Sequence, residues 1–286
     1  MKYYPLIRGR QYDLLALIAA LDAGLSANIV PVVEPVKDIA GLPRVVAAFT
    51  KAQHPLLIVQ NPQVGQYGLL KTPKYVLPDP LPAPVQFARY FDGTDTPAAV
   101  VIAQSAAQVA LLAPDQFAVV PNTAVVRAAG HAPAIYLEDH YPTRAQTQDY
   151  YFLQDELYQY PKRFLPGVGT ADYPLATAEY DEHGYPQRAI ALHLLHVDAG
   201  CLHVRHFVSV NNDDYSNPGA KFFETLAPLR AWLTVHPDAA TPATTELLAL
   251  GARHHFPGLG TIRKLELMHW LTVYDRWLAA GENEKV

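Results

Sequence analysis

The sequence predicts an α/β fold, and within that class a TIM-barrel-like (β/α)8 barrel. Short apolar runs alternate with helical patterns along most of the 286 residues, which is typical of parallel sheets. With a hairpin included, these steps come close to the eight strands that a barrel needs. A barrel typically takes about 250 residues, so one barrel with additions accounts for the chain length.

A doubly wound open sheet is the alternative fold. Such sheets commonly bind nucleotides through a G-x-G-x-x-G or G-x-x-x-x-G-K-[ST] motif that follows a strand. Neither motif follows any predicted strand here, which favours the barrel. We expect a single decorated barrel domain over residues 1–286.

The first part of the chain has the clearest strand and helix pattern. A short strand at 3–7 precedes a helix at 12–25, whose leucines recur at helical spacing. The run at 28–33 is apolar on both faces, as in a strand buried within a parallel sheet. A helix at 41–52 and a strand at 55–59 continue the alternation.

The alternation stops in a proline-rich segment, 61–97, which we predict to be an irregular insertion after the third strand. Within it, residues 84–91 have a short helical pattern. Strands and short helices then resume at 98–103, 105–112, 117–120, 123–129 and 133–137.

The last part of the chain is predicted to begin with a long helix at 143–160, capped by Thr143, and a weak strand at 164–168. Two apolar runs, 189–196 and 201–210, flank a Gly-containing turn and predict a β-hairpin. We expect this hairpin to supply the closing strand of the barrel. Helices are predicted at 219–235, 244–253 and 262–280, the last two within a C-terminal helical extension, 241–280.

Composition excludes several classes of protein. The net charge of −5 gives no support to non-specific binding of nucleic acid or of an anionic membrane. The single cysteine, Cys201, excludes an intramolecular disulfide framework and fits a reducing compartment. Neither a signal peptide nor an apolar run of membrane-spanning length is present, so we expect a cytoplasmic protein.

Polar side chains follow nearly every predicted strand, at the end of the barrel where active sites lie. We call this end the barrel mouth. The expected catalytic residues are Arg8, Glu34, Glu138, Asp172 and His206, and the expected ligand-binding residues are Asn61, Gln104, Asn122 and Asn211. Two of the carboxylates could act as general acid and base or hold a divalent cation, and Arg8 offers a planar fork for a carboxylate or phosphate. Each residue taken alone could instead be an ordinary turn starter.

The histidines of the hairpin have a structural alternative. Strand alternation places His206 on an apolar face, where a histidine is more often a core residue than a ligand. His193 is expected to pair across the hairpin with His203 or Arg205. The polar residues 209–214 after the second run are either part of a site or a solvated loop. No H-E-x-x-H or C-x-x-C motif occurs, so no metal site is predicted and the cofactor stays unknown.

Several segments together resemble a known family. These are YYPLIRGRQYDLLAL near the start, PVVEPVK, the hairpin segment from AIALHLLHVDAG to KFFETL, and the late PGLGTIRKLELMHW. Their combination resembles the bacterial sce7725 family, which is itself similar to the beta-protein family named after a T4 phage protein. GTADY at 169–173 looks like the Gly/Ser-Asp-Tyr element of those beta proteins.

The resemblance implies a TIM-barrel-like fold and a role in phage defence or mobile-element conflict, with a small nuclease-like partner of the sce7726 type encoded nearby. It implies no catalytic residue. We therefore expect a component of such a system whose barrel mouth acts on an anionic ligand, for example one that bears phosphate. The alternative is a non-catalytic partner or immunity-type scaffold for the nuclease-like protein. Whether the chain is an enzyme stays open.

Overall fold

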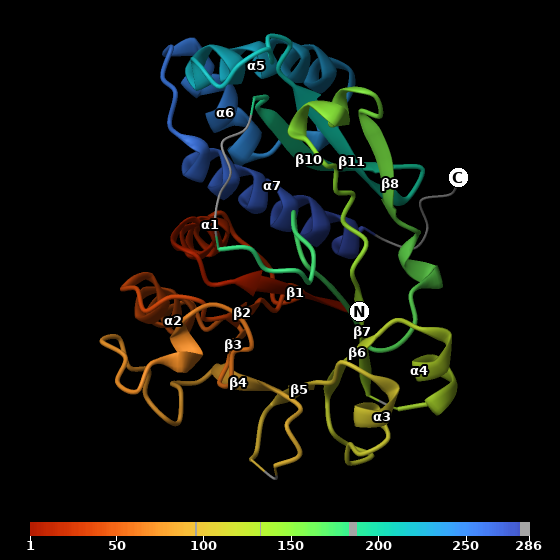
Figure 1. Cartoon of the computed structure of the whole chain (residues 1–286). Coiled ribbons are helices and arrows are strands. Elements are labelled where there is room, and N and C mark those ends of the chain that lie inside the picture. Colours follow the sequence, from red (N-terminus) through yellow and green to blue (C-terminus); the bar gives the residue numbers. More distant parts are fainter. Residues whose placement is uncertain (95, 132, 183–187, 281–286) are drawn as a thin grey trace. The chain divides into compact units, whose positions relative to one another are not determined.

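The computed structural model describes residues 1–94, 96–131, 133–182 and 188–280. These residues form two compact units (Figure 1). Unit 1 comprises Met1–His140 and Leu165–Tyr180, and unit 2 comprises Tyr141–Phe164 and Asp181–Val286. Each unit is described by itself below.

Unit 1 is a closed parallel barrel, which confirms the predicted fold class. In barrel order its strands are β1 (Lys2–Arg8), β2 (Val32–Glu34), β3 (Leu56–Val59), β4 (Val85–Tyr90), β5 (Val100–Ile102), β6 (Ala118–Pro121), β7 (Ala134–Glu138) and β9 (Gly169–Asp172). The strand β9 closes the barrel by pairing in parallel with both β7 and β1.

Helices follow some of the strands of unit 1, as the alternation predicts. They are α1 (Gln11–Asp22), α2 (Gly41–Lys51), α3 (Ala106–Val109) and α4 (Ala124–Ala129), with a 3-10 turn η1 (Tyr67–Leu69). The two short helices begin at hydroxyl caps, because the side chains of Ser105 and Thr123 each accept a hydrogen bond from a backbone N–H in the first turn.

The predicted helical patch at 84–91 is wrong, because this segment is the barrel strand β4. Its residues pair in parallel with β3, from Leu56 opposite Val85 to Val59 opposite Ala88. Alternate side chains, Ala88 and Tyr90, face the barrel core, whereas Phe87 and Arg89 between them are only partly buried. The period of two residues, not the helical period, therefore describes this segment.

The barrel interior is filled by every second side chain of the strands, as in a packed TIM barrel. These residues are Tyr4, Leu6, Val30, Val32, Leu57, Val59, Ala88, Tyr90, Val100, Ile102, Val119, Ile135, Ala171 and Tyr173. Their parity fixes which residues at the strand ends continue into the barrel mouth.

Unit 2 is built on a three-stranded antiparallel sheet in the order β10-β11-β8 (Figure 1). Its strands are β8 (Asp155–Gln159), β10 (Ala191–Asp198) and β11 (Cys201–Val208). Its helices are α5 (Pro218–Val235), α6 (Pro242–Ala252) and α7 (Leu259–Ala279). Its 3-10 turns are η2 (Thr147–Tyr151), η3 (Lys162–Phe164) and η4 (Pro237–Ala239). The predicted hairpin is confirmed. Asp198 pairs with Cys201, so Ala199 and Gly200, both with positive φ, form a two-residue turn.

Two expectations about this region are wrong. The hairpin does not close the barrel, because β10 and β11 pair with each other and β11 pairs with β8. The segment 143–160 is not one helix, because it contains η2 and β8. Its aromatic and leucine spacing looks helical, but β8 is paired with β11 in antiparallel fashion, from Gln159 opposite Leu202 to Asp155 opposite Arg205. The predicted strand at 164–168 falls just short of β9, which begins at Gly169.

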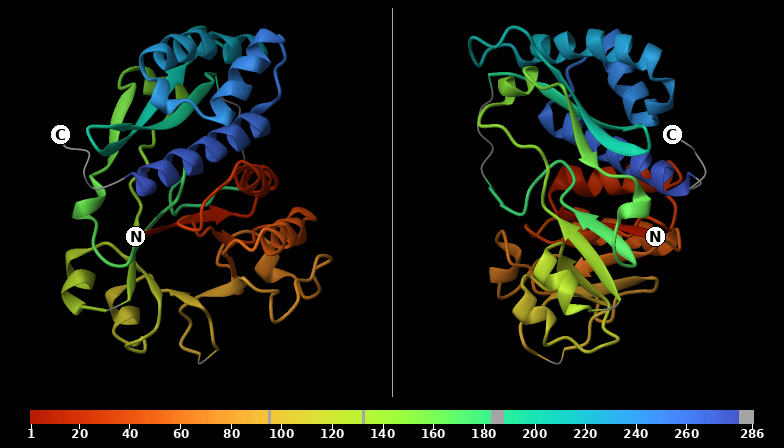
Figure 2. Two further views of the ribbon diagram at one scale, coloured as in Figure 1. Left: turned by 180° about the vertical axis from the view of Figure 1, so that it is seen from behind. Right: turned by 90° about the vertical axis from the view of Figure 1, so that its right-hand side faces the viewer.

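Helix α7 lies along the free edge of β10 (Figure 2). Glu266 on this helix accepts a hydrogen bond from the His193 N–H at 2.7 Å, and the His269 ring contacts the Leu195 carbonyl through Nε2 at 2.7 Å. The His193 N–H and the Leu195 carbonyl, which point away from β11, thereby gain hydrogen-bond partners that an uncovered sheet edge lacks. Within the described ranges no helix is long and apolar enough to cross a membrane.

Candidate functional site

The barrel mouth of unit 1 contains a buried ion pair between the last residues of β1 and β2. Arg8 and Glu34 are register partners on adjacent strands. Both continue the inward-facing series of their strands, after Leu6 and Val32. Arg8 is 9% exposed and Glu34 is 3% exposed, and Nη1 of Arg8 contacts Oε2 of Glu34. The structure thus brings together two of the five residues that the sequence analysis expects to be catalytic.

Glu34 is surrounded by hydrogen-bond donors. Its Oε1 accepts from the backbone N–H groups of Gln63 at 2.6 Å and Val64 at 3.2 Å. Its Oε2 accepts from the Tyr90 hydroxyl at 2.9 Å as well as from Arg8. Burial, and then the charge of Glu34, raise the pKa of Tyr90, so this hydroxyl stays a donor. With four donors the carboxylate is held in one orientation, and it in turn orients Arg8.

The Arg8 guanidinium is fixed on its other sides as well. Its Nη2 donates to the Ala178 carbonyl at 2.7 Å, and its Cζ lies 5.0 Å from the centre of the Tyr173 ring. Burial alone would lower the pKa of Arg8, but the charge of Glu34 raises it overall. The buried Nε–H finds no acceptor within the part of the chain that the structure describes. This N–H is unused hydrogen-bonding capacity at the barrel mouth.

Glu138 and Asp172 lie side by side but have the wrong parity for the barrel interior. They are register partners on β7 and β9. Asp172 lies between the core residues Ala171 and Tyr173 and so belongs to the outer face of its strand, where it accepts a hydrogen bond from the Tyr3 hydroxyl. Glu138 accepts from the Asn122 amide at 2.9 Å. Neither carboxylate contacts the Arg8–Glu34 pair through these bonds.

The expected ligand-binding residues of unit 1 are partly used by the fold. The Asn61 side chain joins β3 to β4, since its Oδ1 accepts from the Tyr90 N–H at 2.8 Å and its Nδ2 donates to the Tyr90 carbonyl at 3.0 Å. Asn122 bonds to Glu138 and to Arg127. Gln104 is exposed just after β5. Only Gln104 therefore presents its side chain to solvent.

Sequence reasoning did not identify the two tyrosines of the barrel mouth, Tyr90 and Tyr173. Tyr90 was missed because its strand was predicted as a helical patch. Tyr173 directly follows Asp172, and counting in steps of two from the apolar residues of β9 would have selected it in place of Asp172. Strand parity was thus the signal that the sequence offered.

His206 belongs to unit 2, where it lies in a chain of buried polar side chains. It is 1% exposed. Its Nε2 is 3.0 Å from Oε1 of Glu156, and its Nδ1 is 2.7 Å from Nδ1 of His193. The Tyr150 ring packs 4.5 Å from the His206 ring. Burial above all lowers the pKa of His206 to about 4 and that of His193 well below its usual value, so both rings are neutral near pH 7.

The register of the hairpin corrects one expectation about these rings. His193 lies opposite His206, and not opposite His203 or Arg205. Because the Glu156 carboxylate only accepts hydrogen bonds, neutral His206 carries its proton on Nε2 and accepts at Nδ1 from the His193 N–H. The arrangement fixes the tautomers of both rings. It satisfies buried polar groups and does not by itself imply catalysis.

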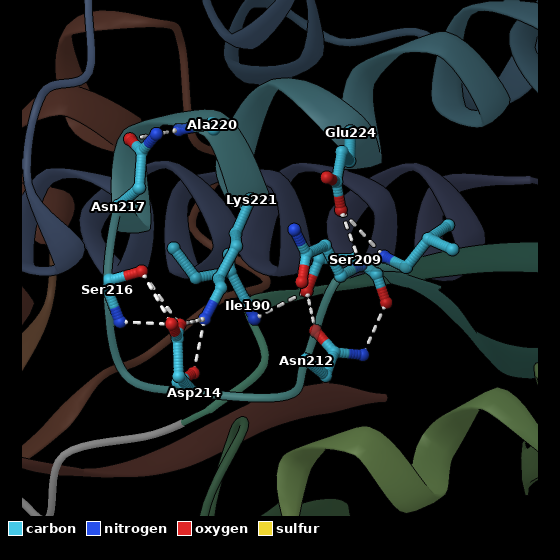
Figure 3. Close-up of polar contacts among 11 residues, drawn as sticks. Ile190, Ser209, Asn212, Asp214, Ser216, Asn217, Ala220, Lys221 and Glu224 are labelled. Atoms are coloured by element: carbon cyan, nitrogen blue, oxygen red, sulfur yellow. Dashed lines mark hydrogen bonds and ion pairs between the residues drawn. The ribbon is translucent and has the colours of Figure 1, made fainter.

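The polar residues after β11 form a connection between β11 and α5 (Figure 3). The Ser209 hydroxyl accepts from the Ile190 N–H at 3.0 Å and donates to Oδ1 of Asn212. Glu224 on α5 accepts from the backbone N–H groups of Val210 and Asn211. The expected ligand-binding residue Asn211 therefore contributes its main chain to this connection.

The start of α5 uses the rest of the polar run. Asn217 caps the helix, since its side chain accepts from the Ala220 N–H at 3.2 Å. Asp214 accepts from both the N–H and the hydroxyl of Ser216, and Lys221 donates to the Asp214 carbonyl (Figure 3). The loop and the helix cap thus engage Asp214, Ser216 and Asn217.

A cluster with metal-ligating side chains lies on the sheet of unit 2, although the sequence analysis predicted no metal site. One ligand atom from each of Asp155, His196 and His203 lies within 4.8 Å of the others. Three different strands supply these residues, so no short motif reveals them. The hairpin turn does hold a signal, because counting back from Ala199 and Gly200 places His196 opposite His203.

In comparisons with protein-family models, curated proteins and solved structures, nothing matches the chain. The functional argument therefore depends on the arrangement of the side chains themselves.

Proposed function

We propose that unit 1 binds a small anionic ligand at the barrel mouth, with Arg8 as the anchoring cation. The observation that supports this proposal is the buried Arg8 Nε–H without an acceptor among the described residues. An unsatisfied buried donor costs about 1–3 kcal/mol, and a charged donor costs more. A carboxylate or phosphate oxygen of a ligand would offset this cost and would complete the guanidinium's hydrogen bonds.

The surroundings of Arg8 suit such a role because they hold the guanidinium before any ligand arrives. Glu34, the Ala178 carbonyl and the Tyr173 ring each constrain one side of it. A fixed fork loses little conformational entropy on binding. In this proposal Glu34 positions Arg8, because four donors hold the Glu34 carboxylate in one orientation against the guanidinium.

The proposal is tested by ligand binding to the full chain. Isothermal titration calorimetry would use inorganic phosphate, nucleoside phosphates and small dicarboxylates. At least one of these classes should bind the wild type, and Arg8→Lys, which keeps the charge but loses the fork, should weaken that ligand about tenfold or more. Arg89→Lys is the matched control, because Arg89 on β4 pairs with Asp92 away from Glu34. Absence of binding by every class, or equal binding by Arg8→Lys, would contradict the proposal.

The biological setting that we propose is a bacterial phage-defence or mobile-element conflict system, supported by the resemblance to the sce7725 family. In that setting the barrel would act on its anionic ligand as the enzymatic component. Demonstrating turnover requires a ligand identified by the calorimetry described above. Loss of turnover but not of binding in a barrel-mouth variant would separate catalysis from recognition.

A second candidate, a binding scaffold for a small nuclease-like partner, is favoured by an exposed apolar segment in unit 2. Residues 151–164 carry large side chains that are 46–85% exposed: Tyr151, Phe152, Leu153, Leu157, Tyr160 and Phe164. They surround β8, which is an edge strand of its sheet. Exposed apolar side chains gathered in this way are typical of interaction sites.

The scaffold function makes a different prediction from ligand binding. Co-purification with the product of the neighbouring gene should survive Arg8→Lys and should be lost in Phe152→Asp. The opposite pattern would refute the scaffold function, because it would make the barrel mouth and not the apolar segment the determinant of binding.

A further inference from the structure

We propose that unit 2 binds a divalent transition-metal ion, with Zn²⁺ as the best fit, between Asp155, His196 and His203. This site is separate from the barrel mouth and does not depend on the function proposed for it. Each ligand comes from a different strand of one sheet, namely β8, β10 and β11. A divalent ion bound there would connect all three strands.

The strand register places the three side chains on one face of the sheet. His196 and His203 are direct cross-strand partners. Asp155 lies opposite Arg205 on β11, and Arg205 is two residues from His203, so it shares a face with it. This face is opposite to the one with His193 and His206, because His193 is an odd number of residues from His196.

The distances between the ligand atoms are close to those of a tetrahedral site. Nε2 of His196 is 3.2 Å from both carboxylate oxygens of Asp155, and Nδ1 of His203 is 3.2 Å from Oδ1. A tetrahedron with metal–ligand bonds of about 2.0–2.1 Å has edges of about 3.3–3.4 Å. Two of the three edges are therefore already near the required length.

The two histidines differ in a way that suits a metal site. His196 is 4% exposed, and its ring packs roughly perpendicular to the Trp232 ring on α5 with centroids 5.1 Å apart, so the direction of its Nε2 is constrained. Its Nδ1 has no hydrogen-bond partner among the described residues. The His203 side chain is 23% exposed, which lets solvent and ions reach the cluster and lets this ring adjust.

Two further side chains near the cluster affect its chemistry. Arg205 opposes cation binding, since its Nη1 is 3.8 Å from Oδ2 of Asp155. Its Nη2, however, also donates to the amide oxygen Oε1 of Gln154 at 3.1 Å, and the side chain is 26% exposed, so Arg205 keeps a hydrogen-bond acceptor if it moves away from Asp155. His236 is exposed, and its ring lies 6.1 Å from that of His196.

Two histidines and one carboxylate leave coordination positions open, unlike a closed structural zinc site. Water can occupy the fourth position of a tetrahedral ion. The same ligand set also occurs with iron(II) in oxygenases, so ion identity is a measured outcome, with preference for Zn²⁺ over Mg²⁺ expected from the imidazole ligands.

The experiment uses the untagged full chain, freed of metal with a chelator. Zn²⁺ alone is titrated in a calorimeter, and Co²⁺ alone is followed by its visible absorption, which reports the coordination geometry. The wild type should bind a single ion of each metal. His203→Ala and Asp155→Asn should each weaken binding about tenfold or more. The matched control is His255→Ala, which removes an exposed histidine elsewhere in unit 2.

Tryptophan fluorescence of each variant checks that unit 2 is folded. Because the His203 side chain is partly exposed, His203→Ala should disturb the fold little. Binding that is unchanged in His203→Ala and Asp155→Asn would overturn the proposal. So would a wild type that binds neither Zn²⁺ nor Co²⁺, because the three side chains would then form only a hydrogen-bonded group.

Discussion

Replacing Glu266 by glutamine is expected to stabilise unit 2 at alkaline pH and to change its stability little at acidic pH. Glu266 lies on α7 and is 6% exposed. Burial raises the pKa of its carboxyl to about 7, against smaller opposite effects from the His193 N–H and the Arg263 charge. Glutamine carries no charge at any pH and still offers an oxygen to the His193 N–H.

The sign and the size of the effect follow from proton linkage. The folded protein keeps this proton up to about pH 7, whereas the unfolded chain releases it near pH 4.5. The contribution of the protonated carboxyl to stability is therefore complete below about pH 4.5 and is lost as the pH rises to about 7. Since one pKa unit corresponds to about 1.4 kcal/mol, wild-type Glu266 costs unit 2 up to about 3 kcal/mol at pH 8.

Urea unfolding followed by tryptophan fluorescence measures this effect in unit 2 alone. All the tryptophans lie in this unit: Trp232, Trp270 and Trp277. The free-energy difference between Glu266→Gln and wild type should grow by up to about 3 kcal/mol from pH 4.5 to pH 8. His206 and His269, whose burial lowers their pKa to about 4, destabilise both proteins alike as the pH falls. Glu246→Gln is the control for loss of a charge, because the Glu246 side chain on α6 is 46% exposed. A free-energy difference between Glu266→Gln and wild type that does not change with pH would refute the reasoning.

Two further predictions concern backbone positions. Gly167 has a φ of 75°, and an added Cβ would lie 2.4 Å from the Ala134 carbonyl oxygen, whereas a Cβ at Gly93, whose φ is 76°, would meet nothing within 4 Å. Gly167→Ala should therefore destabilise unit 1 by about 1–3 kcal/mol more than Gly93→Ala. Chemical unfolding followed by circular dichroism measures both losses of stability, and equal losses would contradict the prediction. Asn217 caps α5 at a φ of 48°. Asn217→Ala should therefore lower the free energy of unfolding of unit 2 by about 0.5–2 kcal/mol and Asn217→Gly by only a few tenths. Unfolding followed by tryptophan fluorescence measures both values, and a larger loss in Asn217→Gly than in Asn217→Ala would contradict this account.

The barrel could be predicted from the sequence because most of its strands are continuous apolar runs buried on both faces. The run at 28–33 and the strands β3 and β7 have this character. The strand β4 lacks it, since its outward-facing residues Phe87 and Arg89 are only partly buried. A strand that is polar on one side loses the continuous pattern, and six residues are too few to separate the two periods.

The region around β8 was mispredicted because its partner is distant in the chain. The hairpin β10-β11 is local and was identified by its turn residues. The pairing of β8 with β11 is set by tertiary contacts, which no local pattern contains. The metal-ligating cluster depends on the same long-range pairing, and so it could not be found from motif spacing.

At the barrel mouth, the strand ends indicate where the site lies, but a residue at a strand end faces the barrel interior only if it has the parity of the core residues. Arg8 and Glu34 close β1 and β2 on the inward side, and the structure brings them together. Glu138 and Asp172 also close strands, but one residue out of phase with the core. A shift by one residue turns a side chain to the other face, so strand ends must be read together with parity.

The division of unit 2 into two segments has a consequence for the order in which the chain can fold during synthesis. The barrel is complete once β9 has been made, because its last partners, β7 and β1, are already present. The strand β8 is made earlier but must wait for β11, which follows β9 in the chain. Once β9 has been synthesised, the nascent chain therefore has all the strands of the barrel but also carries β8, which is still unpaired and flanked by exposed apolar side chains. A chaperone or an early partner would find its target there, before the hairpin emerges.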